Sequence, residues 1–254
     1  MSIKKRDIMD FVECLKTSPA MLTVGSVDTR FEHEFGLTTS GRSAFVHLFS
    51  SEGRIALAKM YSSYMEVAAE HDMPMVVHTT TWRAHPDAIA RHRFDRPGDL
   101  RRINIAAADF LLSRHREVGA KKNVYIAGYM GARVDGYDPA GAPDAATAES
   151  YNRDQAAMLA ECGVDLLKAG TIAGVDGLLG LGRALAATDL HYILAPVIDP
   201  TGTMPDGTPL AEAVERVDAG TSRPPLNFII NCVHPTHFAE AAAGPAWPGQ
   251  HRSG

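Results

Sequence analysis

Cysteine is scarce in this sequence. Three cysteines, Cys14, Cys162 and Cys232, stand at wide spacing among 254 residues. A disulfide framework needs paired cysteines, so the odd count argues against one and favours a reducing compartment. Cys14 and Cys162 lie in helix-like segments, where we expect them to be small apolar packing residues.

Long apolar runs and basic stripes are also missing. The first ten residues carry charges throughout, which is not the pattern of a signal peptide or a membrane anchor. The net charge is −5, and the 25 Lys and Arg residues are scattered apart from short clusters. This distribution argues against nucleic acid or an anionic membrane as partner. We therefore expect a cytoplasmic protein with a small-molecule partner.

Apolar runs alternate with helical patterns along the whole chain. The strand-like runs are Met21–Val27, Met75–Thr81, Val124–Met130, Val164–Leu167 extending toward Ile172, Tyr192–Ile198 and Phe228–Val233. Helical patterns include an apolar face at Ile55, Leu57, Met60, Tyr61, Tyr64, Met65 and Ala68, then Leu100–Val118, Glu149–Cys162, Val175–Ala187 and Leu210–Ala219. This alternation predicts an α/β fold with a parallel sheet.

The absence of a dinucleotide-binding motif reduces the choice among α/β folds. No Gly-x-Gly-x-x-Gly follows the first strand-like run, so an open sheet of the dinucleotide-binding type has no support. We predict a (β/α) TIM-type barrel in which about six βα units are recognisable, so that the barrel is incomplete. No linker or repeat divides the chain, and we expect residues 1–254 to form a single barrel domain.

Three connections after strand ends are long: Asp28–Gly53, Trp82–Gly98 and Gly131–Ala148. In barrels, the residues that follow the carboxyl ends of the strands carry the chemistry. The first connection is rich in aromatic and titratable groups, including His33 and His47, which is typical of a lid that closes over a ligand. A loop that packs against an incomplete barrel would have the same composition.

Several short segments share an order that is typical of one enzyme family. They are Thr79-Thr-Thr-Trp-Arg-Ala84, Ile126-Ala-Gly-Tyr-Met-Gly131, Asp135-Gly-Tyr-Asp-Pro139, Tyr151-Asn-Arg-Asp-Gln155, Cys162-Gly-Val-Asp-Leu-Leu167, Thr171-Ile172, Asp206-Gly-Thr-Pro-Leu210 and Asn231-Cys-Val-His-Pro235. Each segment is weak alone, but together they span most of the chain. In this order they resemble the homocysteine S-methyltransferase family of zinc-dependent (β/α)₈ barrels.

The resemblance implies a zinc site of which this chain carries only a part. In that family three thiolates hold zinc, and the metal activates the homocysteine sulfur, which as a free thiol is only a few per cent ionised near neutral pH. The resemblance makes Cys232 the first ligand. The other two would come from a Gly-Gly-Cys-Cys motif, and no cysteine follows Cys232. Where the family binds the homocysteine amino group with acidic residues, Val24 and Gly170 stand here.

Other residues at strand ends are candidates with two interpretations each. His78 is an acid/base or metal-ligand candidate, or a histidine hydrogen-bonded to a neighbouring strand or loop. Arg83 could pair with a substrate carboxylate or phosphate, or anchor an acidic residue of an adjacent loop. Asp135 and Tyr137 could hydrogen-bond a polar ligand, although Asp and Gly also stabilise tight turns.

Cys232, His234 and His237 offer sulfur and nitrogen donors close together in sequence. Zinc accepts both kinds of donor, so Cys232 and His234 are metal-ligand candidates. Alternation sends both side chains to one side only if the strand persists that far. Otherwise Cys232 is a thiol that lines the barrel and the histidines face solvent.

The leading hypothesis is an enzyme of the methyltransferase type. It would transfer a methyl group from a donor that the sequence does not name to a thiol or a related small polar substrate. Cys232 would be its remaining zinc ligand, and Thr80, Thr81, Asp135 and Asn231 would line the pocket. The open edges of an incomplete barrel invite pairing with another chain, so we also expect a homodimer or larger homo-oligomer.

Two other functions remain open. The first is a metal-independent lyase or hydrolase that uses His78, Asp135 and Cys232 as acid/base groups or nucleophile. The second is a non-catalytic protein that binds a ligand or stabilises a partner, because a fold does not fix a function.

Overall fold

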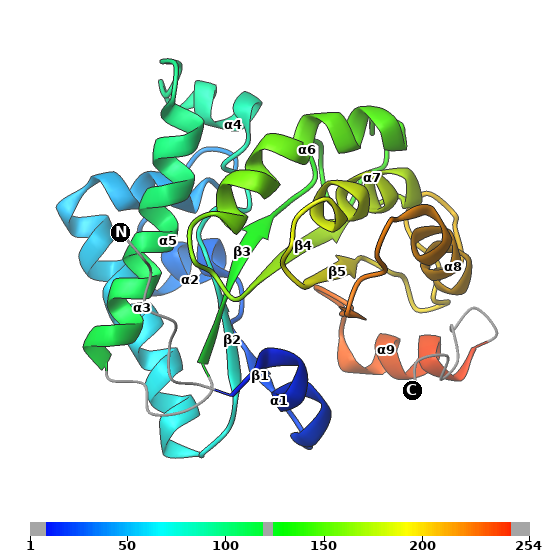
Figure 1. The fold of residues 1–254 in the computed structure, drawn as a ribbon, viewed down its shortest axis with the longest axis horizontal. Coiled ribbons are helices and arrows are strands. Elements are labelled where there is room, and N and C mark those ends of the chain that lie inside the picture. Colours follow the sequence, from blue (N-terminus) through cyan, green and yellow to red (C-terminus); the bar gives the residue numbers. More distant parts are fainter. Residues whose placement is uncertain (1–8, 119–123, 245–254) are drawn as a thin grey trace. The chain divides into compact units, whose positions relative to one another are not determined.

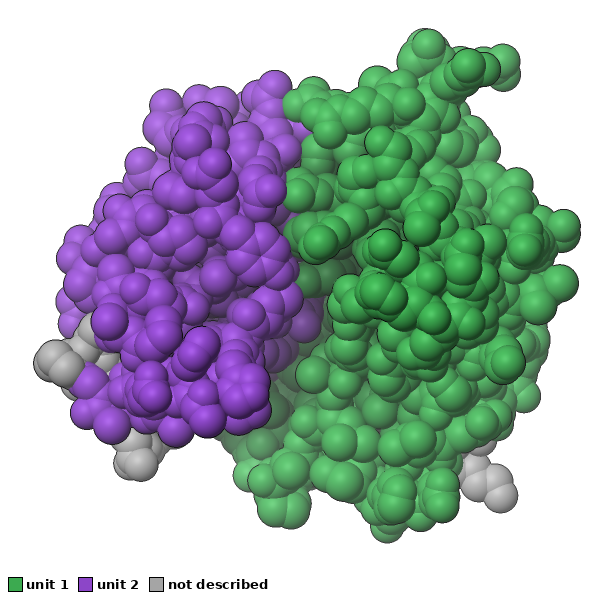
Figure 2. All heavy atoms as spheres, turned by 180° about the vertical axis from the view of Figure 1, so that it is seen from behind, with its two compact units in different colours: residues 1–129, 158–166 green, residues 130–157, 167–254 purple. Residues whose placement is uncertain are grey.

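The computed structural model describes residues 9–118 and 124–244. The chain forms two compact units, which Figure 2 distinguishes by colour. Unit 1 comprises residues 1–129 and 158–166, and unit 2 comprises residues 130–157 and 167–254.

Unit 1 contains the first three strands and the helices between them (Figure 1). In chain order its elements are α1 (Phe11–Thr17), β1 (Leu22–Thr23), α2 (Val27–Phe35), the 3-10 helix η1 (Ala44–Phe49), α3 (Ser51–Glu70), β2 (Met75–His78), α4 (Pro86–Arg91), α5 (Asp99–Val118) and β3 (Val124–Met130), whose last residue falls in unit 2. β2 pairs in parallel with both β1 and β3. The carboxyl ends of the three strands therefore lie along one edge.

Helix α3 shows why these residues fold locally as they do. The Ser50 side chain accepts a hydrogen bond from the Gly53 amide and so caps the helix start. The apolar face predicted from the sequence is buried at Leu57, Met60, Tyr61, Met65 and Ala68. The prediction is wrong for Ile55, which is 70% exposed.

Unit 2 contains the other three strands. Its elements are α6 (Ala145–Ala160), whose last residues belong to unit 1, then β4 (Leu166–Ile172), α7 (Val175–Ala186), β5 (Tyr192–Pro196), α8 (Leu210–Gly220), β6 (Asn227–Phe228) and α9 (Pro235–Ala243). β5 pairs in parallel with both β4 and β6. α7 contacts both β5 and α8 (Figure 1).

The two faces of the β4 and β5 strands differ in what covers them. Leu194 of β5 packs beside Gly182 of α7, so its face is the one that the helices cover. Side chains alternate along a strand and register partners share a face. Lys168 therefore lies on the opposite face, together with its register partner Ile193 and with Asn227 of β6.

The α/β class with parallel strands is confirmed, and strand β3 has the predicted bounds. β1 and β6 are shorter than predicted, although amide hydrogen bonds to β5 continue as far as Asn231. The long connection Asp28–Gly53 is not loop-like throughout, because it contains most of α2 and all of η1. Helix α2 forms because the Ser26 side chain caps the Thr29 amide and the left-handed Gly36 ends the helix. No helix in the described part of the chain is long and apolar enough to cross a membrane.

Two glycines of α7 provide a matched test of packing in unit 2. A Cβ at Gly180 would lie 2.5 Å from both the Ala145 carbonyl oxygen and the Ala148 Cβ of α6, whereas one at Gly177 would meet Ile172 at an ordinary 3.5 Å. We expect Gly180→Ala to lower the free energy of unfolding by about 1–3 kcal/mol through overpacking. Gly177→Ala should raise it by up to about 1 kcal/mol through helix propensity. Urea denaturation checks both, and a Gly180→Ala variant as stable as Gly177→Ala would contradict the packing.

Candidate functional site

His78 ends β2 in unit 1 and is held from several sides. Its carbonyl oxygen accepts a hydrogen bond of 2.7 Å from the Tyr61 hydroxyl, and its ring lies against the Tyr129 ring with centroids 4.2 Å apart. The side chain is buried. These contacts agree with the interpretation of a histidine fixed by neighbouring elements, and they also fix its ring at the end of a strand.

The three threonines after His78 divide into two roles. Thr79 Oγ1 accepts from the Tyr129 amide at 2.9 Å, and Thr81 Oγ1 donates to the Tyr129 carbonyl at 2.6 Å, so both link β2 to β3. Thr80 is only 5% exposed, and its Oγ1 has no hydrogen-bond partner among the described residues. A buried hydroxyl without a partner is costly unless a ligand or water satisfies it. Thr80 is therefore the better ligand-binding candidate.

Asp28, which the sequence reasoning missed, follows β1 within the first turn of α2. Burial raises the pKa of this carboxyl to about 7, and a hydrogen bond with the Ala44 backbone and the charges of Arg42 and Arg83 oppose that rise only in part. Arg83 itself stacks on the Trp82 ring at 4.3 Å. Its effect on Asp28 supports the interpretation that Arg83 anchors an acidic residue of a neighbouring segment. The sequence signal for Asp28 was its position directly after the strand-like run Met21–Val27.

The segment after β3 belongs to unit 2 and lies against β4. Asp135 Oδ1 accepts from the Tyr137 amide at 2.9 Å, which is the local turn bond expected of this residue type, and Tyr137 is 46% exposed. Gly136 approaches the strand so closely that a Cβ there would clash with the Thr171 carbonyl oxygen. Only glycine allows this contact, which fixes Asp135 beside the end of β4.

Asp135 also lines a small cavity of about 20 Å³, together with Arg133 and Asn152. Asn152 is buried and its Oδ1 has no hydrogen-bond partner in the described part of the chain. The amide group donates to the Ala148 carbonyl at 2.7 Å, so the orientation of the side chain is fixed. A cavity of this size has room for one water molecule and not for a substrate.

Lys168 is the second residue that the sequence reasoning missed. It lies within β4, on the face opposite to Leu194 and α7, and is only 4% exposed. Burial lowers the pKa of its ammonium to about 8, and an electrostatic interaction with Cys232 opposes that shift. Cys232 is thus close enough to Lys168 to influence its pKa.

Unusual backbone occurs at the carboxyl ends of β4 and β6. Thr171 has a φ of 62° at a β-bulge, and Cys232 has a φ of 55°. Left-handed backbone is unfavourable for residues with a Cβ, most of all for a β-branched threonine, and such strain gathers at functional sites. Cys232 is exposed, and the preceding Asn231 donates its amide to the Pro196 carbonyl at 3.3 Å. Cys232 and Asn231 therefore both lie at a strand end.

The donor set does not fit a zinc ion. His234 Nδ1 accepts from the Thr236 amide at 3.3 Å and so caps α9. The Cys162 thiol donates to the Met158 carbonyl at 3.0 Å, and burial raises its pKa to about 11. Within residues 9–118 and 124–244, no three side chains of His, Cys, Asp and Glu are grouped so that they could hold a metal ion. We derive no chemical step through zinc.

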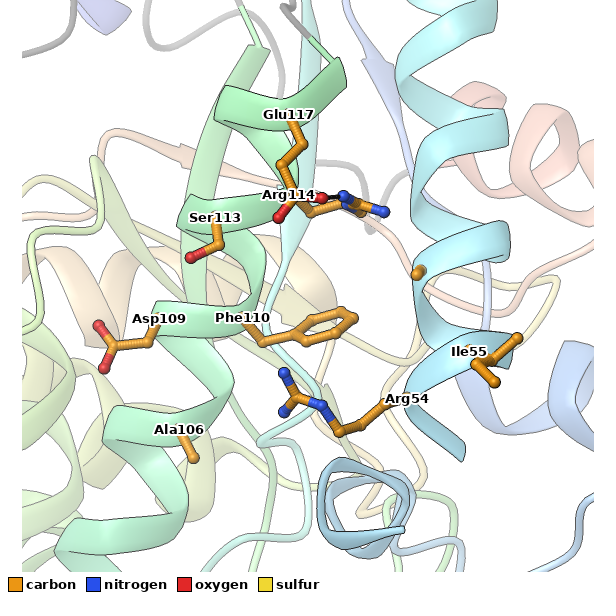
Figure 3. A pocket seen from close by; sticks show the side chains of 9 residues that line it. Arg54, Ile55, Ala106, Asp109, Phe110, Ser113, Arg114 and Glu117 are labelled. Carbon is orange, nitrogen blue, oxygen red and sulfur yellow. Dashed lines mark ion pairs between the residues drawn. The ribbon is translucent and has the colours of Figure 1, made fainter. Parts of the chain in front are cut away.

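A larger cavity in unit 1, of about 420 Å³, lies between helices α3 and α5 (Figure 3). The Arg54 guanidinium stands over the Phe110 ring at 5.1 Å, and Asp109, Arg114 and Glu117 complete a charged rim. No residue from a strand end lines it. Size alone therefore does not make this groove the functional site.

The profile of the homocysteine S-methyltransferase family matches residues 21–246. The chain belongs to this family. Crystal structures of the homocysteine methyltransferase MmuM from Escherichia coli have a similar fold. Its metallated form has a TM-score of 0.74 at 18% identity, over 90% of this chain and 80% of that chain. Its oxidized form has a TM-score of 0.71 at 17% identity, over 89% and 78%. At this identity the likeness shows the fold alone. None of the curated proteins matches this sequence.

The burial of Lys168 predicts a pH-dependent stability. The folded-state pKa of about 8 lies below the ordinary 10.5, so the folded state binds fewer protons between these values and stability rises with pH through that window. We expect Lys168→Met to raise the free energy of unfolding by about 3 kcal/mol at pH 7, with the gain fading toward pH 10.5. Urea denaturation across pH measures it. Lys59→Met, at an exposed position, is the control, and a gain that does not vary with pH would contradict the burial argument.

Proposed function

We propose that this family member transfers a methyl group to a thiol or a related small polar acceptor at the carboxyl ends of its strands. The observation that carries the proposal is the family match over residues 21–246, which includes the strand-end segments of both units. Thr80, with its buried hydroxyl, is a ligand-binding candidate of unit 1. In unit 2, Asn231 would bind the acceptor. Cys232 would stand beside it.

The chemistry of this proposal differs from that of zinc-dependent relatives. Without a metal, the acceptor must lose its proton before it attacks the methyl carbon, and the methyl group then moves from the donor to the acceptor as the donor leaves. An acceptor that is more acidic than a free thiol would satisfy this requirement. Val24 and Gly170 also leave the homocysteine amino group without the carboxylates that the family resemblance implies, which favours a different small polar substrate.

Several finer features belong to the same proposal. An incomplete barrel that spans the whole chain as one domain, assembly into a homodimer or larger homo-oligomer, and a cytoplasmic location all remain predictions. Size-exclusion chromatography with light scattering measures the assembly directly.

A methyl-transfer assay tests the proposal. The chain is incubated with S-adenosylmethionine or S-methylmethionine and a set of small thiols that includes homocysteine, and methylated products are identified by mass spectrometry. We expect turnover that survives a chelator, and Cys232→Ser or Asn231→Ala should lower kcat/KM by about 10-fold or more, a loss of about 1.4 kcal/mol of transition-state stabilisation.

Cys162→Ser is the matched control, because that thiol is bonded locally to Met158. It should leave kcat/KM within about twofold of the parent protein. Absence of product with every thiol, or activity that needs added zinc, would contradict the proposal.

A further inference from the structure

Ile55 is an apolar side chain that packing within unit 1 leaves on the surface. It is 70% exposed, more than any other large apolar side chain in the described part of the chain. It lies near the start of α3 and lines the groove between α3 and α5. A single exposed isoleucine is ordinary, but one at the rim of a groove is a candidate contact residue.

The groove beside Ile55 has a partly apolar lining and room for side chains of a partner. Its volume is about 420 Å³, which is within the range of small-molecule pockets. Ala58 of α3 and Ala106 of α5 line it with methyl groups, and Phe110 of α5 adds an aromatic ring (Figure 3). Small side chains on both helices therefore leave space that a larger apolar side chain from outside can fill.

Two charged groups at this groove have no ion-pair partner within residues 9–118 and 124–244. The Arg54 guanidinium of α3 lies over the Phe110 ring at 5.1 Å and contacts no carboxylate there. Asp109 of α5 is exposed and pairs with no cation there. Arg114 and Glu117, by contrast, form an ion pair with each other. One unpaired charge of each sign therefore remains at the groove, and the two charges belong to different helices.

These features complement a second copy of the same surface. In a two-fold symmetric dimer every contact occurs twice, because the same patch of each subunit faces its counterpart. Two copies that face each other across this groove would each place Ile55 in the groove of the other. Arg54 of each copy would then lie opposite Asp109 of the other, so that two pairs of opposite charge form.

The surface formed by the two helices also has the dimensions that a dimer needs. α3 and α5 contain 20 residues each. Each helix is therefore about 30 Å long, and two helices side by side cover a width of about 20 Å. The resulting footprint of roughly 600 Å² is close in scale to the roughly 800 Å² that each partner buries in a standard interface.

We propose that α3 and α5 form the interface of a symmetric homodimer, in which Ile55 enters the groove of the second copy and Arg54 pairs with its Asp109. This surface differs from the open strand edges at which the sequence alone places pairing. The proposal also goes beyond methyl transfer and does not depend on it, because no residue from a strand end lines the groove.

The mass of the full chain in solution tests the proposal. Analytical ultracentrifugation over a range of protein concentrations should show a dimer of the parent chain. Ile55→Asp should weaken dimerisation by about 10-fold or more, because it places a charge in the apolar part of the contact. Val67→Asp is the matched control, since Val67 is a 43% exposed apolar residue of the same helix that does not line the groove. It should leave the dissociation constant within about twofold of the parent value.

An exchange of the two charges separates a specific contact from a loss of folding. Arg54→Glu and Asp109→Arg should each weaken the dimer by about 10-fold or more, because like charges then face each other. A mixture of the two variants should recover dimers with one copy of each, since both opposite-charge contacts are restored, and native mass spectrometry identifies them. A parent chain that stays monomeric, a dimer that survives Ile55→Asp, or a mixture without mixed dimers overturns the proposal, whether or not the chain transfers methyl groups.

Discussion

The burial of one ammonium group on β4 is the constraint on which the site in unit 2 depends. Taking the Lys168 charge out of water is unfavourable, and the stability to offset it comes from the apolar strands and helices around it. The same strand ends in a bulge at Thr171, which the closely approaching Gly136 holds in place. Lys168 and the strained Thr171 lie three residues apart on one strand, and both perturbed ionisable groups and backbone strain gather at functional sites.

Unit 1 also contains an ionisable group whose pKa is shifted by burial, and this group is an acid where Lys168 is a base. Asp28 is half-buried at the start of α2, with a pKa that burial raises to about 7. The family resemblance implies carboxylates at positions 24 and 170, where this chain has valine and glycine. In this chain Asp28 stands four residues after position 24, and Lys168 stands two residues before position 170. Both ionisable groups therefore differ in place from the acidic residues that the family resemblance implies, and Lys168 also differs in sign.

Much of the fold follows from periodicity, because long apolar runs and amphipathic repeats are local properties. β3, α5, α7 and α8 were predicted closely for this reason. β6 was predicted too long because its apolar sequence continues past the last regular pair. α2 was missed because its few apolar residues resemble a polar connection, and the Ser26 cap decides its start.

The candidate site could be predicted only in part. Cys232, Asn231 and Thr80 followed from their segments, but each depends on tertiary contacts for its role. Lys168 was passed over because one polar residue in a strand-like run carries no periodic signal, and the side that it faces depends on its pairing with β5. Packing also produces the bulge at Thr171, which no local sequence pattern encodes. The same holds for Thr80 Oγ1, which has no hydrogen-bond partner among the described residues.

The most direct measurement is the titration of Lys168 itself. In protein labelled with ¹³C-lysine, the Cε resonance assigned by its loss in Lys168→Met is followed from pH 6 to pH 11. We expect an apparent pKa of about 8, well below the values of the exposed lysines in the same spectra. A titration near 10.5 would show that the amine is hydrated in the folded protein and would contradict the central role given to its burial.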